Sequence, residues 1–112
     1  MKVSKVEAPT CEGGENPIWH TAEQALYYID NTGCKVHRHH PESGINTTWS
    51  TPSVITTFVF HQSGNAIVTL HSGIASLDFS NGATAMLQPL PENPPYVYND
   101  GTVDREGRFI IG

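Results

Sequence analysis

Charge is scarce in this chain, and long apolar runs are missing. Only 15% of its 112 residues are Asp, Glu, Lys or Arg, and the six Lys and Arg do not cluster. Because a nucleic-acid interface needs a basic patch or arm, we do not expect nucleic acid as a partner. No apolar stretch approaches the roughly 20 residues of a membrane-spanning helix, and the first nine residues lack the apolar core of a signal peptide. We therefore expect no membrane partner.

Cysteine is almost absent as well. Cys11 and Cys34 are the two cysteines, and they do not form a Cys-x-x-Cys pair. Two isolated cysteines make a weak case for a disulfide framework. The sequence therefore favours a reduced, cytoplasmic protein.

Helical periodicity is also scarce, and short apolar or alternating runs between turn residues take its place. Ten Gly and eight Pro separate these runs. The runs predicted to be strands are residues 25–30, 57–60, 66–70, 74–79, 83–87 and 108–111. Together with the composition, they predict an all-β fold.

The predicted strands recur with a nearly constant period. A strand segment, four turn residues and a second strand begin at positions 17, 58 and 101, so that the spacings are 41 and 43 residues. A period of about 40–50 residues is typical of β-propeller blades, each with about four strands. Residues 1–112 would then form two blades and the first hairpin of a third, which is an incomplete β-propeller. A compact β-sandwich is the alternative that the periodicity leaves open.

An incomplete propeller needs a partner to close it. Propellers close with about 4–8 blades, and terminal blades without neighbours expose apolar faces and a strand edge. We therefore expect either the remainder of the propeller or a completing chain to cover these faces.

Two motifs resemble a known family. The sequence GENPIW at residues 14–19, a strand that ends at Asp30, and KVHR at residues 35–38 are similar to the opening blade of the regucalcin/gluconolactonase family. The sequence NDGTVD at residues 99–104 resembles a second family motif, about as far from the first as in family members. The resemblance implies the N-terminal two and a half blades of a six-bladed β-propeller. It also implies hydrolysis of a sugar lactone with a divalent cation in the central channel.

The resemblance assigns roles to three residues. Glu15 matches the family's first metal ligand, and its carboxylate suits Ca²⁺, Mg²⁺, Mn²⁺ or Zn²⁺. Asn99 matches an Asn that contacts substrate, and Asp100 lies beside it. For Asp100, a hairpin turn formed by Asn-Asp-Gly is an equally open interpretation. The remaining ligands and the general base are expected beyond Gly112, so we name no catalytic residue and expect this stretch alone to be inactive.

One position departs from the family pattern. Val97 stands where some members have an Arg that contacts substrate, so the substrate is expected to differ from theirs. The rival interpretation is a non-catalytic propeller fragment that serves as a binding or assembly module. In that case Glu15 and Asn99 are relics of the enzyme.

Two further patterns suggest cation binding. His37, His39 and His40 are close in sequence, and the first two would share one face of a strand. No further His or Cys follows at a ligand spacing, so an exposed strand is the preferred interpretation. The sequence DREG at residues 104–107 resembles part of a calcium loop but lacks the repeated Asp ligands, so a turn is predicted there.

Overall fold

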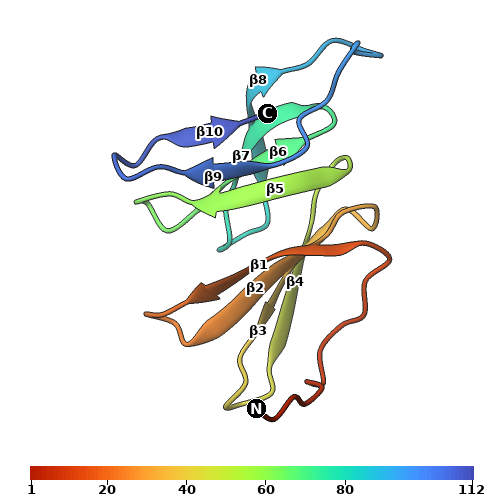
Figure 1. Cartoon of the computed structure of the whole chain (residues 1–112). Helices are drawn as coiled ribbons and strands as arrows, with labels where there is room; N and C mark the ends of the chain where they lie inside the picture. The colour runs from red at the N-terminus through yellow and green to blue at the C-terminus, as the bar shows by residue number, and fades with distance from the viewer.

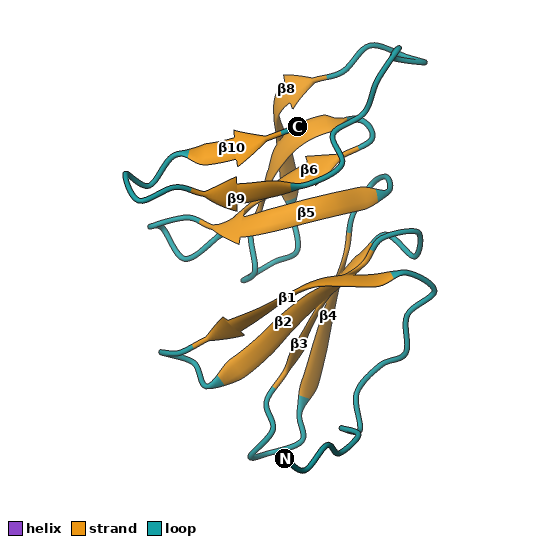
Figure 2. Ribbon diagram, in the orientation of Figure 1, coloured by secondary structure: helices purple, strands orange, loops and turns teal.

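The computed structural model describes residues 1–112 and contains only strands, turns and loops, as predicted. Ten strands form two four-stranded antiparallel sheets and one separate hairpin (Figures 1 and 2). The first sheet contains β1 (Gly14–His20), β2 (Ala25–Asp30), β3 (Lys35–His39) and β4 (Asn46–Ser50). The second sheet contains β5 (Ile55–Phe60), β6 (Ala66–Leu70), β7 (Gly73–Leu77) and β8 (Thr84–Pro89). The hairpin contains β9 (Gly101–Val103) and β10 (Phe109–Ile111).

Each sheet is a meander whose strands follow one another in chain order. The predicted repeat starts at positions 17, 58 and 101 fall in β1, β5 and β9, the first strand of each unit. Strand β5 contacts β1 on one side and β9 on the other, so the three first strands are neighbours (Figure 1). The hairpin lies beyond β5, away from the first sheet. This third layer is inconsistent with a two-sheet sandwich and fits consecutive blades.

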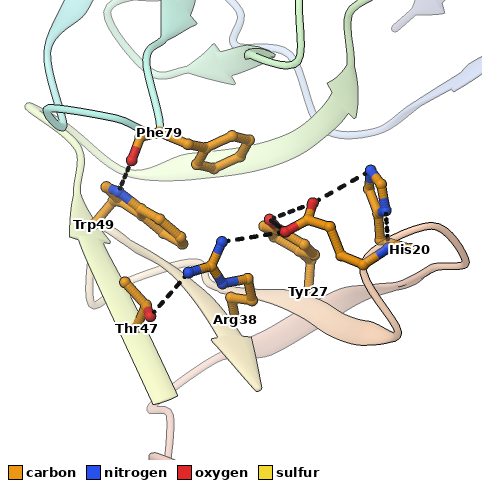
Figure 3. Close-up of polar contacts among 7 residues, drawn as sticks. His20, Tyr27, Arg38, Thr47, Trp49 and Phe79 are labelled. Atoms are coloured by element: carbon orange, nitrogen blue, oxygen red, sulfur yellow. Dashed lines mark hydrogen bonds and ion pairs between the residues drawn. The ribbon is translucent and has the colours of Figure 1, made fainter. Parts of the chain in front are cut away.

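The core lies between the two sheets. Tyr27 of β2 is 1% exposed, and its ring lies 6.3 Å from Phe58 and 4.8 Å from Phe60 in β5. Trp49 of β4 packs edge-on against Phe79, with ring centroids 4.7 Å apart, and its indole N–H donates to the Phe79 carbonyl oxygen at 3.0 Å (Figure 3). These large aromatic side chains join the first blade to the second.

A network of hydrogen bonds and ion pairs lies at the edge of this core. The Tyr27 hydroxyl lies 3.0 Å from both carboxylate oxygens of Glu23, and Arg38 donates to the same carboxylate at 3.2 Å. Arg38 also donates to the Thr47 hydroxyl and lies over the Trp49 ring (Figure 3). The charges of Glu23 and Arg38, which are partly exposed, are therefore paired with each other where the two blades meet.

Asn31 fixes the start of β5 against the end of β2. Its side-chain amide donates to the Ile55 carbonyl oxygen at 2.7 Å, and its own carbonyl oxygen accepts the Ile55 N–H at 3.3 Å. Its N–H donates in turn to the Gly13 carbonyl oxygen at 2.8 Å. Asn31 thus holds the segment before β1 and the first residue of β5 at the same end of the molecule.

Strand β4 was not among the runs predicted from the sequence. Its residues NTTWS are mostly polar, and only Trp49 among them is buried. The strand forms because its backbone pairs with β3 from Lys35↔Ser50 to His39↔Asn46, at the outer edge of the sheet. Such an edge strand has little apolar pattern for sequence reasoning to detect.

Candidate functional site

Glu15 lies at an irregular point of β1. The pairing of β1 with β2 shifts its register between Glu15 and Ile18, and Asn16 within this bulge has φ = 56°. Asn tolerates this left-handed conformation better than most residues. The Asn16 side chain donates to the Phe58 carbonyl oxygen at 3.3 Å and accepts from the Thr57 hydroxyl at 3.2 Å. The bulge is thereby tied to β5, and it leaves the Glu15 side chain exposed.

Asn99 and Asp100 immediately precede β9. Their backbone N–H groups both donate to the Gly112 carbonyl oxygen, at 2.8 and 3.1 Å. The Asp100 carboxylate accepts the Gly101 N–H at 2.7 Å. A side chain at position 101 would collide with β10, because a Cβ there would lie 2.6 Å from the Phe109 ring. Glycine is therefore required where the hairpin closes beside these two polar residues.

The hairpin turn itself lies elsewhere, so the turn interpretation of Asn99-Asp100-Gly101 is wrong. Strands β9 and β10 are joined through residues 104–107, where Gly107 has φ = 79°. The Asp104 carboxylate accepts the N–H groups of Glu106 and Arg108, both at 2.9 Å. These contacts confirm the turn predicted for that segment and leave Asp100 free of a turn-forming role.

The structure brings the three predicted site residues together. Glu15, Asn99 and Asp100 line one cavity of about 420 Å³ with Asn16 and Thr56. The lining residues come from the starts of β1 and β5 and from the segment just before β9. Each of these strands is the first of its unit, and β5 lies between the other two. None of the five is apolar. The cavity therefore presents carboxylates, amides and a hydroxyl to a ligand.

Asn16 and Thr56 were not predicted, although the repeat contained a signal for Thr56. The 41- and 43-residue spacings lead from Glu15 to Thr56 and then to Asn99. Thr56 is 6% exposed, and its hydroxyl lies 2.7 Å from that of Thr69 in β6. Its position is thus fixed by a buried contact within the second blade.

Val97 lies outside this cavity. Its side chain is 40% exposed in the segment between β8 and β9, and it is not among the cavity-lining residues. Val97, which stands where some members of the resembled family have an Arg, therefore presents no side chain to this cavity.

The histidines of β3 differ from the prediction. His37 and His39 do share one face, as expected, because they pair with alternate residues Tyr28 and Leu26 of β2. The exposed-strand interpretation is wrong, because the two side chains are only 3% and 4% exposed. Neighbours along β3 could not reveal this burial, because it depends on side chains of other segments, such as Tyr28, whose ring lies 5.0 Å from that of His37. His39 lies 2.7 Å from the Asn46 amide oxygen.

The fold defines part of a β-propeller, with a polar cavity at the starts of its first strands. Residues 13–112 match the family described as SMP-30/gluconolactonase/LRE-like region. The chain belongs to this family, as its two motifs predicted. The structure contains no helix that is long and apolar enough to cross a membrane.

Relatives of known sequence include regucalcins and lactonases. The chain is 30% identical to regucalcin from Xenopus laevis over 113 residues, which cover all of this chain and 38% of the relative. It is 38% identical to 6-deoxy-6-sulfogluconolactonase from Pseudomonas putida over 103 residues, which cover 88% of this chain and 34% of that protein. A pentonolactonase from Haloferax volcanii is 28% identical over 114 residues. The chain thus spans little more than a third of the length of these relatives.

Solved structures confirm the predicted fold class, the N-terminal two and a half blades of a propeller. A calcium-binding protein, regucalcin, from Agrobacterium tumefaciens superposes with a TM-score of 0.79 at 20% identity, over 90% of this chain and 35% of that one. A luciferin-regenerating enzyme gives a TM-score of 0.71 at 23% identity, over 88% of this chain and 35% of that one.

Proposed function

We propose that the complete protein hydrolyses a sugar lactone and that the cavity around Glu15 is part of its active site. The observation that carries this proposal is the convergence of Glu15, Asn99 and Asp100 on one polar cavity from two separate units of the fold. Membership of a family in which two of the matched relatives are named lactonases supports it.

The donor set of the cavity fits a hard divalent cation. The side chains of Glu15, Asp100 and Thr56 offer a cation only oxygen ligands. The side-chain amides of Asn16 and Asn99 add carbonyl oxygens. Oxygen-only sets suit Ca²⁺, Mg²⁺ and Mn²⁺ better than Zn²⁺, which prefers nitrogen and sulfur. We infer that Glu15 is the main ligand from this chain. Other ligands and the general base would come from the rest of the ring, because such sites need about three or more protein ligands.

The neighbouring side chains are suited to hold the substrate. The Asn99 amide can donate to one sugar hydroxyl and accept from another, since it carries both kinds of group. One oxygen of Asp100 accepts the Gly101 N–H, and the second oxygen is available to a ligand. A bound cation would polarise the lactone carbonyl and lower the pKa of a bound water. These residues would therefore orient the lactone ring, which opens to an aldonic acid.

Val97 favours a second candidate, a propeller module that binds ligands without catalysis. Its exposed isopropyl group replaces the guanidinium that would clamp a polar substrate, and it lies outside the cavity. A binding module would hold a cation or sugar acid at Glu15 and Asn99 without opening a lactone ring. Turnover therefore separates the two candidates.

The test compares Glu15→Gln with wild type in the complete protein. The substitution keeps the size of the side chain but removes its charge. Lactone ring opening, measured against added Ca²⁺, Mg²⁺, Mn²⁺ or Zn²⁺, should fall at least about a hundredfold. The free energy of unfolding should change by less than about 0.5 kcal/mol, because Glu15 is exposed.

The matched control is Glu92→Gln in the exposed loop after β8, which should leave turnover unchanged. Full activity of Glu15→Gln at an unchanged cation requirement would remove this residue from the site. Cation binding by wild type without turnover of any sugar lactone would support the binding module instead.

A further inference from the structure

A second group of metal-ligand side chains lies on the other side of the first blade. One ligand atom each of Cys11, Asp30 and His37 lies within 4.8 Å of the other two. Asp30 ends β2, His37 is in the middle of β3, and Cys11 lies in the segment before β1. They share a cavity of about 470 Å³ with Thr48. This cavity is separate from the one around Glu15, with no lining residue in common.

The His37 ring lines this cavity and has one nitrogen without a hydrogen-bond partner. Its Nδ1 lies 2.8 Å from the Thr48 hydroxyl, whereas its Nε2 is buried and has no hydrogen-bond partner. A buried polar atom without a partner costs about 1–3 kcal/mol, so native proteins rarely retain one without a reason. Burial lowers the pKa of His37, although the Asp30 charge opposes this shift. In the neutral tautomer whose Nδ1–H donates to the Thr48 hydroxyl, Nε2 carries the free lone pair.

Asp30 has one lone pair left for a cation. Its Oδ1 accepts the N–H groups of Gly13 and Gly33 at 3.0 and 3.1 Å, and its Oδ2 accepts the N–H of Glu12 at 3.3 Å. An ionised carboxylate offers about four acceptor sites, so three are occupied and the fourth, on Oδ2, is free. Burial acts to raise the pKa of Asp30, but the three N–H donors outweigh it and hold that pKa below its usual range. The carboxylate is therefore charged and rigidly held.

Cys11 supplies the third ligand. Both cysteines of the chain are free, and Cys11 is half-buried beside Asp30. Burial, and to a lesser extent the Asp30 charge, raise the pKa of its thiol. A thiolate and a carboxylate together balance one divalent ion. The ammonium group of Lys35, which also lines the cavity, donates to the Gly33 carbonyl oxygen at 3.1 Å.

We propose that Cys11, Asp30 and His37 bind a Zn²⁺-class ion, with a water or a further side chain at the fourth position. Sulfur, nitrogen and oxygen donors suit Zn²⁺, with bonds of about 2.0–2.3 Å that place tetrahedral ligand atoms about 3.3–3.8 Å apart. Because the observed atoms lie within 4.8 Å of one another, they must approach by no more than about 1.5 Å. Cys11 can supply this movement, because it lies outside every strand. The ion would tether the N-terminal segment to β2 and β3.

The thiolate makes the proposal directly testable with Co²⁺, which replaces Zn²⁺ and gives a thiolate-to-cobalt charge-transfer absorption. The purified protein is stripped of metal with a chelator and titrated first with Co²⁺ and then with competing Zn²⁺. Wild type should develop the absorption at one equivalent. Cys11→Ser should abolish it and His37→Gln should weaken Co²⁺ affinity at least about a hundredfold.

Matched controls come from the same chain. Cys34→Ser removes the other free thiol, and His39→Gln removes the other buried histidine of β3, so both variants should retain the absorption. Glu15→Gln should retain it too, because Glu15 belongs to the other cavity. If His37→Gln does not fold, the comparison of Cys11→Ser with Cys34→Ser decides alone. No thiolate absorption in wild type, or absorption that survives in Cys11→Ser, overturns the proposal.

Discussion

Tyr27 is the side chain on which contact between the first two blades depends most. It is 1% exposed and touches Phe58 and Phe60 across the interface, and it is stacked 6.3 Å from Trp49. Deleting a buried aromatic ring costs about 3–5 kcal/mol, because transfer energy is lost and a cavity remains. Tyr27→Ala should therefore lower the free energy of unfolding by at least this amount. For a domain stable by about 5–15 kcal/mol, this is a large fraction of the total.

Tyr27→Phe isolates the hydroxyl from the ring. The hydroxyl lies 3.0 Å from both Glu23 oxygens, and Glu23 keeps Arg38 as a partner after the substitution. The loss should be about 0.5–1.5 kcal/mol, the net value of a typical hydrogen bond. In a double-mutant cycle, Glu23→Gln should cost little more in the Tyr27→Phe background than its contacts with Arg38 and His20 account for.

The assay is urea unfolding of the complete protein, followed by fluorescence and by circular dichroism. Tyr96→Ala, at a residue that is 63% exposed, is the control and should change the free energy by less than about 0.5 kcal/mol. A cost below 1 kcal/mol for Tyr27→Ala would refute the assignment of the core to the space between the two sheets.

Three further predictions concern the hairpin and the isolated chain. Gly101→Ala should lower the melting temperature and weaken cation binding, because a Cβ there meets the Phe109 ring at 2.6 Å, whereas Gly112→Ala meets nothing within 4 Å and should do neither. The N–H and guanidinium of Arg108 hold the pKa of Asp104 below its usual range, so this charge stabilises the fold above about pH 4. The difference in melting temperature between wild type and Asp104→Asn should therefore shrink as the pH falls through the folded pKa; a difference independent of pH would contradict this. Residues 1–112 alone should associate in size-exclusion chromatography with light scattering, because apolar side chains of the outer blade faces are exposed; a monomer with a cooperative melt would show otherwise.

Sequence reasoning predicted the parts of the fold that repeat along the chain. The starts at 17, 58 and 101 identified the first strand of each unit, because hairpins with similar turns recur at a fixed interval. Glu15, Asn99 and Asp100 were recognised from local motifs, and the structure places all three in one cavity. Their roles there stay predictions.

Features made by pairing between distant segments were missed. Cys11, Asp30 and His37 are separated by up to 26 positions, and they meet only because β2 pairs with β3 while the entry to β1 folds beside Asp30. No spacing rule brings such residues together. The burial of His37 likewise depends on its neighbours in β2 and β4, which a pattern along one strand does not contain.

The polar cavity has a consequence for how its chemistry can change. Glu15, Thr56 and Asn99 enter it from the same end of three consecutive first strands, and each carries a different functional group on the same kind of scaffold. An acid, a hydroxyl and an amide can thus be exchanged one blade at a time, while the backbone that presents them stays unchanged. Thr56→Glu, for example, would add a carboxylate to the cavity at the cost of the buried contact with Thr69. In a ring of repeats, ligand preference can therefore change through single side chains at the strand ends, while the strand pairing that stabilises the fold stays the same.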